Sequence, residues 1–387
     1  MASPETQPDT LEAREYNRIR RRLEVFDFLL SLAGLLILLV TGWSADLRDL
    51  AYRAGAENYV RAVFYYVLML AVLAKLAGAG LDYYGFRLEH HYQLSNQKFR
   101  AWVWDEVKSW LVGLALATIV VELLYFIIRV APRYWWLIAW AAFLVLFVFF
   151  VQIAPVVVFP IFYKFQPLRR EELCRRLTRL SERAGARVRG VYEWKLSEKS
   201  KKANAALTGL GNTRRIILAD TLLENYSDDE IEAVLAHELG HHVHRHILKT
   251  IGVHTGITLF GFWASAQVLH SIGERAPHMF HGDYDFANLP LLALLSAAIS
   301  FLLLPAMNAW SRHNERQADR YAFQALPSVA PFITSMNKLA AQNLAERSPS
   351  RLVECFFHSH PPVAKRIAAA EAWEQIQTGT PPPHSRG

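Results

Sequence analysis

Long apolar segments constrain this chain more than any other feature of its sequence. Six of them are each about long enough to cross a bilayer as a helix, which takes roughly 20 apolar residues. Hydrophobic residues make up 52% of the 387 positions, a high fraction for a soluble protein. We therefore expect a multi-pass membrane protein instead of soluble domains with buried core helices. The segments begin at Phe26, Val60, Trp110, Trp135, Thr250 and Leu289.

The basic residues beside these segments predict the direction of crossing. The sequence RIRRR at positions 18–22 precedes the first span, which indicates a cytoplasmic N-terminus. We expect this span to be kept as a signal anchor, because the later spans hold the chain in the membrane anyway. Basic residues also follow the fourth span, from Lys164, and the sixth, from Ser311. The expected location is the cell inner membrane, with the soluble stretch after the fourth span and the segment after the sixth, which hold the candidate site, toward the cytoplasm.

Charge and cysteine content exclude several other classes of protein. The net charge of +7 comes largely from Arg and Lys beside the spans, so it indicates topology and no nucleic-acid partner. Cys174 and Cys355 are too few for a disulfide framework or a cysteine metal site. Both are expected on the cytosolic side, where they would stay reduced.

One long soluble stretch separates the fourth and fifth spans. Alternating apolar residues and turn residues between 189 and 226 predict two or three strands, one of them the apolar run Arg215–Ala219. Ser227 followed by Glu230 forms a capping box, which marks the start of a helix. Ile231 and Leu235 then recur four residues apart on one side of that helix.

The sequence HELGH on this helix has the pattern H-E-x-x-H. His237 and His241 lie one turn apart and can direct two nitrogens at one Zn²⁺, while Glu238 sits at the edge of the same face. Zinc lowers the pKa of its water to about 7, so a neighbouring carboxylate can take that proton. The pattern predicts hydrolysis of a peptide bond with one zinc per chain. The remaining histidines are expected to form a solvated or headgroup-facing strip: His242, His244 and His246.

A catalytic zinc needs a third protein ligand and keeps a fourth position open. Thermolysin-like enzymes take the third ligand from a glutamate on a later helix. After the sixth span, Glu315 and Asp319 lie one turn apart on a predicted helix. Glu315 is the candidate ligand, and Asp319 could accept the second N–H of a ligating histidine. The alternative is a solvated charged face that these acids share with Arg312, Arg316 and Arg320.

The order of these motifs resembles the type I CAAX prenyl protease family, integral-membrane zinc metallopeptidases of the gluzincin group. HELGH is followed after two spans by SRHNERQAD, as in that family. Three further segments resemble the family's early loop, the segment before its metal helix and its C-terminal element, so the resemblance covers most of the chain. They are YGFRLEHHYQLSNQ from Tyr84, NAALTGLGNTRRIILADTLL from Asn204 and HSHPPVAKRI from His358.

The resemblance implies roles for individual residues. It makes His237, His241 and Glu315 the zinc ligands, Glu238 the base and Asp319 the partner of a ligating histidine. Asn204 and Ala205 match an edge strand along which a substrate backbone would lie. His360 and Arg366 match positions that steady the substrate or the oxyanion. From the residues alone, His360 could equally be a capping or core histidine. The alternative for Arg366 is an ordinary ion-pair partner.

The fold expected is an all-α multi-span membrane helical barrel that carries a small α+β gluzincin-type zinc metalloprotease domain. The family has seven membrane helices, so either a break is hidden between Trp135 and Tyr163 or this barrel is smaller. Ala206 and Leu207 stand where the family often has aromatic residues. The expected partners are the bilayer and a polypeptide substrate. Candidates for this substrate include membrane-associated and lipidated chains.

Two other functions compete with this one. A stress-induced membrane quality-control metalloprotease would share the zinc motif but typically lacks the two extra early spans. A metal-binding transporter would not need Glu238.

The expected divisions of the chain are a polar tail (1–24), a membrane region (25–163) with a loop at 81–107, a soluble catalytic part (164–248) with the zinc helix at 228–247, two spans (249–310), a ligand helix with the His-Pro-Pro element (311–375) and a disordered tail (376–387).

Overall fold

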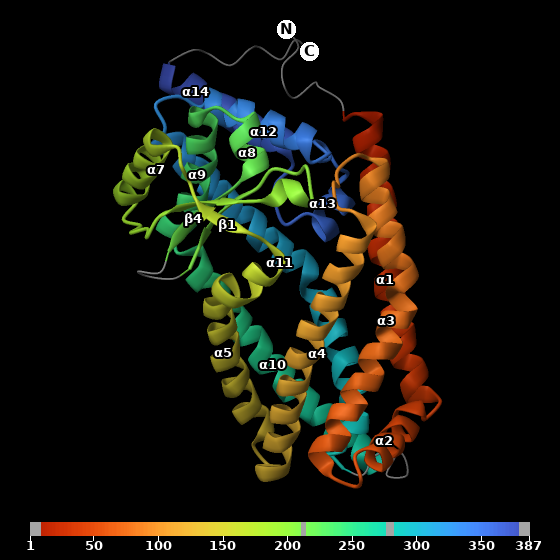
Figure 1. Ribbon diagram of the computed structural model, residues 1–387. Helices are drawn as coiled ribbons and strands as arrows, with labels where there is room; N and C mark the ends of the chain where they lie inside the picture. The colour runs from red at the N-terminus through yellow and green to blue at the C-terminus, as the bar shows by residue number, and fades with distance from the viewer. Residues whose placement is uncertain (1–8, 210–213, 276–281, 379–387) are drawn as a thin grey trace.

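A computed structural model describes residues 9–209, 214–275 and 282–378. Long helices form an elongated part, and a small sheet with shorter helices covers one end of it (Figure 1). The helices and strands, in chain order, are α1 (Leu11–Val40), α2 (Trp43–Ala54), α3 (Tyr59–His91), α4 (Phe99–Val130), α5 (Trp135–Ile153), α6 (Phe159–Phe162), β1 (Phe165–Pro167), α7 (Glu171–Arg183), β2 (Val191–Trp194), β3 (Ala205–Thr208), β4 (Arg215–Ala219), α8 (Asp220–Asn225), α9 (Asp228–Val243), α10 (His246–Arg275), α11 (Leu289–Ala325), α12 (Ala330–Gln342), α13 (Arg351–Phe357) and α14 (Val363–Thr378).

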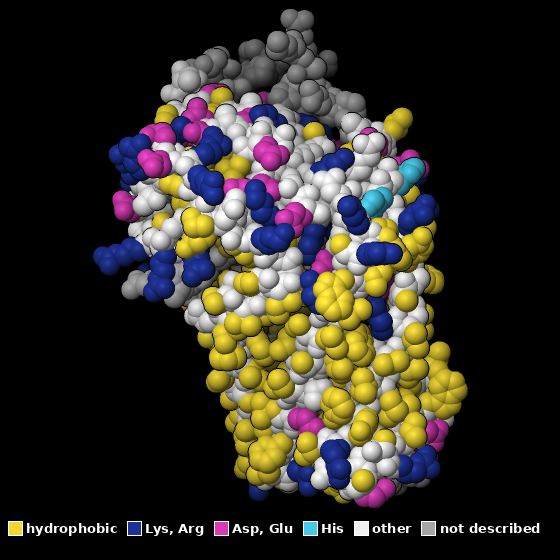
Figure 2. Space-filling view, in the orientation of Figure 1, with side chains coloured by type: hydrophobic (Ala, Val, Ile, Leu, Met, Phe, Trp, Pro, Cys, Tyr) yellow, Lys and Arg dark blue, Asp and Glu magenta, His cyan; other side chains and the backbone are white. Residues whose placement is uncertain are grey.

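Five helical segments of the described chain are long and apolar enough to cross a membrane. They contain α1, α3, α4, the run from α5 to α6, and α11, which correspond to five of the six predicted spans. The predicted fifth span lies in α10, which packs on α5 and α11 but is less apolar (Figure 1). On the face in Figure 2, hydrophobic side chains cover the elongated part, and charged ones collect at its two ends. This distribution is typical of a protein in a bilayer.

The segment from Trp135 to Phe162 contains no break that would make an additional span. A π-helical stretch, Ala154–Val158, joins α5 to α6 without interruption. Proline cannot donate a backbone N–H, and Pro155 and Pro160 lie in and just after this stretch. The described chain therefore has four long helices before β1, with the short α2 between the first two.

The helices extend further than the sequence divisions indicated. α1 begins at Leu11, where the side chain of Thr10 caps it, so most of the predicted tail is helical. The predicted loop at 81–107 is helical except for residues 92–98. In both places charged residues continue the helix beyond the apolar segment, so the end of the apolar run does not mark the end of the helix. Thr378 ends α14, and the rest of the predicted C-terminal tail lies outside the described residues.

The small sheet has the strand order β1-β2-β4-β3, which leaves β3 at an edge. β2 and β4 are parallel, and the other two pairs are antiparallel. Three of these strands confirm the two or three that the sequence predicted. The capping box at Ser227 is also present, since its backbone N–H donates to Glu230 and its hydroxyl accepts from the Glu230 N–H. The core of this part includes Leu173, Leu177 and Leu180 of α7, Ile216 and Leu218 of β4, and Ile231, Leu235 and Leu239 of α9.

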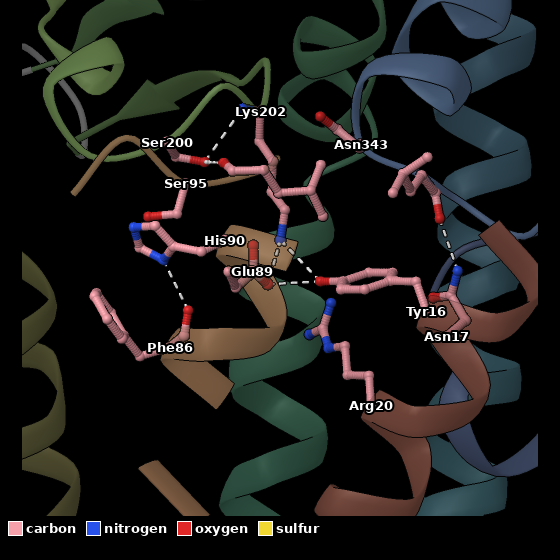
Figure 3. A network of polar contacts seen from close by, with 12 residues as sticks. Tyr16, Asn17, Arg20, Phe86, Glu89, His90, Ser95, Ser200, Lys202 and Asn343 are labelled. Atoms are coloured by element: carbon pink, nitrogen blue, oxygen red, sulfur yellow. Dashed lines mark hydrogen bonds and ion pairs between the residues drawn. The ribbon is translucent and has the colours of Figure 1, made fainter. Parts of the chain in front are cut away.

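Polar contacts join the membrane helices to the chain just before β3. Lys202 donates to Glu89 of α3 over 3.0 Å and to the hydroxyl of Tyr16 of α1 over 3.2 Å (Figure 3). Tyr16 in turn donates to Glu89 over 2.6 Å. The next residue, Ala203, donates its N–H to the side chain of Asn343, the residue that follows α12. Contacts with α1, α3 and the residue after α12 therefore fix the segment that leads into β3.

Candidate metal centre

The candidate metal centre lies where α9 crosses α11, and a glycine permits the close approach of the two helices. A Cβ atom on Gly240 would lie 2.7 Å from Cα and 2.8 Å from the carbonyl oxygen of Ala318. Such distances are too short for a side chain, so only glycine fits here. Ala318 lies between Glu315 and Asp319, so this crossing brings both acids onto the HELGH face.

The three predicted ligands converge in this crossing. The Nε2 atoms of His237 and His241 are 3.3 Å apart. Glu315 places one carboxylate oxygen 3.2 Å from the first nitrogen and the other 3.3 Å from the second. Ligand atoms about 2.0 Å from a tetrahedral ion lie roughly 3.3 Å from one another, so these spacings fit zinc.

The surroundings of Glu315 also fit a cation. Its side chain is only 6% exposed, and Oε2 receives no aligned hydrogen bond from the described residues, although two imidazole nitrogens lie within 3.2 Å. A buried carboxylate oxygen without a donor is costly unless a cation neutralises it. Two imidazole nitrogens and one carboxylate form the donor set of a catalytic zinc with an open position.

The second nitrogen of His237 is held by Asp319. Nδ1 of His237 lies 2.8 Å from a carboxylate oxygen of Asp319, which leaves Nε2 directed at the cluster. Burial and the nearby Arg366 lower the pKa of His237, but its close contacts with the carboxylates of Asp319 and Glu315 outweigh them and raise the pKa to about 9. Without a metal, both nitrogens of this imidazole are therefore protonated at neutral pH, and the ring is positively charged.

Arg366 approaches the same aspartate from α14. Its Nε and Nη2 donate to the two oxygens of Asp319 over 2.9 and 2.6 Å. Burial disfavours the guanidinium charge, but Asp319 and the nearby Glu315 and Glu238 keep the pKa of Arg366 above its ordinary value. Because Nε and Nη2 together grip the two oxygens of one buried carboxylate, this geometry favours the ion-pair interpretation of Arg366 over a direct contact with substrate.

His360 and Glu238 lie at the open side of the cluster. His360 places Nδ1 2.8 Å from Glu315 and leaves 63% of its side chain exposed, so it is not a core histidine. Glu238 is half-buried and makes no hydrogen bond or ion pair with any described residue. A carboxylate of this kind is available to exchange a proton with a substrate or a water molecule.

The predicted substrate strand lies at the sheet edge. Ala205 begins β3, and Asn204 precedes it with an exposed side chain. The carbonyl of Asn204 accepts from the N–H of Ala219 on β4, so the other side of β3 is the one without a strand partner among the described residues. An extended peptide can add to such an edge through main-chain hydrogen bonds.

One residue near the centre departs from the expectation. His246 was expected in an exposed strip, but it is 3% exposed and lies against His241. The predicted helix of 228–247 ends at Val243, and Arg245 has a φ of 54°, in the left-handed region. This bend directs His246 inward. The sequence prediction assumed one continuous helix and therefore gave the wrong direction for the His246 side chain.

The glycine at the crossing can be tested by a small substitution. We expect Gly240→Ala to push α9 away from α11, to lower stability by about 1–3 kcal/mol and to weaken metal binding. Metal content and thermal unfolding of the purified protein measure both effects. Gly252→Ala on α10 is the matched control, because a Cβ there meets no atom within 4 Å. Equal behaviour of the two variants would contradict this account of the crossing.

Comparisons with known proteins agree with this architecture. Residues 167–374 match the model of peptidase family M48, and residues 3–164 match that of the CAAX prenyl protease N-terminal region, described as five membrane helices. The metalloprotease YhfN of Bacillus subtilis is 31% identical over 94% of this chain and 85% of its own length. CAAX prenyl protease 1 of Saccharomyces cerevisiae is 27% identical over 93% and 85%. The crystal structure of S. mikatae Ste24p superposes with a TM-score of 0.84 at 24% identity, covering 93% of this chain and 88% of that one.

Proposed function

We propose how this chain, which belongs to peptidase family M48, hydrolyses peptide bonds as a membrane metallopeptidase. The metal is zinc, one ion per chain, held by His237, His241 and Glu315. The observation that carries this proposal is the convergence of the two imidazole nitrogens and the two oxygens of Glu315 at spacings of 3.2 to 3.3 Å, with one of these buried oxygens receiving no aligned hydrogen bond from the described residues.

The residues around the proposed zinc ion have distinct roles in the reaction. Zinc in such a site lowers the pKa of water to about 7 and polarises a carbonyl group. Glu238 accepts a proton from water at its free carboxylate and delivers it to the departing amine. Asp319 holds the tautomer of His237, and Arg366 holds Asp319. His360 remains available to donate to the oxyanion, since most of its side chain is exposed.

The substrate is a polypeptide that lies as an added strand beside Asn204 and Ala205. Lys202 and its contacts to α1 and α3 keep this edge in place (Figure 3). Relatives named CAAX prenyl protease make a lipidated, membrane-associated peptide the first candidate. The match to the CAAX N-terminal model over residues 3–164 favours this type over the smaller quality-control protease.

The test is cleavage of matched peptides with and without a C-terminal lipid by the purified protein in detergent. Activity should disappear with a chelator and return with zinc. Cleavage of the lipidated peptide alone would support the lipidated class, and equal cleavage would support a general peptide substrate. Absence of cleavage of either peptide by the zinc-loaded protein would favour a metal-binding transporter instead.

The basic residues beside the spans support an orientation with the zinc site in the cytoplasm and a location in the cell inner membrane. The test is impermeant thiol labelling of intact cells, in a background without Cys174 and Cys355. Arg133→Cys, exposed between α4 and α5, should be labelled, and Ser348→Cys should not. The opposite pattern would mean an external zinc site.

The pKa of His237 gives a pH dependence of metal binding. Its pKa of about 9 in the folded protein exceeds the ordinary 6.5, so this proton stabilises the metal-free fold fully below pH 6.5 and ceases to do so above 9. Zinc must displace that proton. We expect about one proton released per zinc bound at pH 7, and affinity that rises toward pH 9. Calorimetry in buffers of different ionisation enthalpy measures the release, and none at pH 7 would contradict the expectation.

A further inference from the structure

His246 is a buried histidine that the proposed zinc site does not use as a ligand. It is the first residue of α10, and its ring lies beside His241 on the side away from the ligand cluster. Its Nδ1 is 3.0 Å from Nδ1 of His241, and its Nε2 is 2.8 Å from Oε1 of Gln317 on α11. His246 thus connects a proposed ligand to the helix that carries Glu315.

The local fold directs this ring toward His241 at a cost in backbone strain. α9 ends at Val243, and Arg245 takes a left-handed backbone conformation that L-residues with a Cβ disfavour. α10 begins at the next residue, His246, whose ring lies against that of His241 on α9. The ring of His244 stacks on that of His246, with centroids 5.4 Å apart and 17° between the planes. A non-glycine residue is held in a strained conformation here, and the strained turn delivers an imidazole to the ligand.

The donors and acceptors in this chain of contacts follow from one condition, that His241 binds the metal through Nε2. Nε2 of His241 faces the cluster and must be free of a proton to bind a metal, so Nδ1 carries it. Nδ1 of His246 must then accept that proton's hydrogen bond. A neutral imidazole that accepts at Nδ1 donates at Nε2, and the atom opposite is the side-chain oxygen of Gln317, an acceptor. Each of the three side chains makes the contact that the next one requires.

We propose that His246 is a positioning residue, which fixes the tautomer and the ring orientation of His241 for zinc. This inference rests on the proposed zinc site. His237 has a carboxylate in the same role, Asp319, whereas His241 has a neutral imidazole backed by an amide. Loss of the partner of a ligating histidine typically weakens metal affinity by about 10 to 100-fold.

The test uses two amides that differ in where they place an oxygen. In His246→Asn, the side-chain oxygen can occupy the place of Nδ1 and accept from His241. In His246→Gln, the amide lies one bond further out, near the place of Nε2, and cannot accept there. We expect His246→Gln and His246→Leu to bind zinc about 10 to 100-fold more weakly than wild type, and His246→Asn to stay close to it.

Zinc affinity is measured by competition with a chelator on the purified full-length protein, with His242→Ala on the same segment as the control that keeps affinity. Unchanged affinity in His246→Leu would overturn the proposal, and so would equal losses in the Asn and Gln variants, because these would indicate packing alone. If His246→Leu fails to fold, Gln317→Leu takes its place: weaker zinc binding supports the chain of contacts, and wild-type affinity overturns it. Peptide cleavage by wild type is measured in parallel, so that a zinc-binding protein without hydrolysis would contradict the proposed function and leave this inference standing.

Discussion

Replacing Glu238 with glutamine is expected to abolish nearly all peptide hydrolysis while leaving about one zinc bound per chain. The reason is that Glu238 is half-buried beside the cluster and makes no hydrogen bond with any described residue, so its replacement breaks no such bond. The amide has nearly the same shape but cannot take up a proton. We expect a loss of at least about 100-fold in kcat, measured with a peptide substrate, alongside the zinc content of the same preparation.

The matched control for this substitution is Glu232→Gln. Glu232 is on the same helix and pairs with Arg176 on α7, away from the cluster. It should keep near-normal hydrolysis. Near-normal cleavage by Glu238→Gln would remove Glu238 from the proton transfer, whereas parallel losses of zinc and activity would make it part of the metal-binding structure. A transporter would show no hydrolysis in any of these variants.

The sequence predicted the parts of this protein that depend on local geometry. HELGH places His237 and His241 one helical turn apart whatever surrounds them, and the capping box at Ser227 fixed the start of that helix. Five of the six predicted spans coincide with long apolar helices, since length and apolarity are properties of a segment by itself. The pairing of Glu315 with this helix was suggested by resemblance, because nothing local connects residues so far apart.

What the sequence did not predict depends on contacts between distant segments. His246 was expected in an exposed strip because the left-handed turn at Arg245 is not visible in the periodicity of the histidines. Arg366 was expected to contact the substrate, with an ordinary ion pair as the alternative, and its two bonds to Asp319 favour the alternative. The predicted fifth span is not among the five helices of the described chain that are long and apolar enough to cross a membrane, although α10, where it lies, packs on α5 and α11.

The second large effect is expected at the two acids of α11. Glu315→Ala should lose most of the bound zinc, because it removes the only carboxylate that lies within 3.3 Å of both His237 and His241 among the described residues. Asp319→Asn should weaken zinc affinity or activity by about 10 to 100-fold. Asparagine can still accept from His237, but it no longer balances the charge of Arg366. Zinc content and chelator competition measure both variants.

The control for these losses is a carboxylate of similar burial that lies outside the cluster. Glu354 on α13 pairs with Lys365 and leaves 14% of its side chain exposed, so Glu354→Ala should keep its zinc. If all three variants lost zinc equally, the cause would be a general loss of structure. Full zinc occupancy in Glu315→Ala would move the third ligand elsewhere. His360 would be the first place to look, because its Nδ1 already lies 2.8 Å from the carboxylate of Glu315 and could follow the metal into the space that alanine leaves.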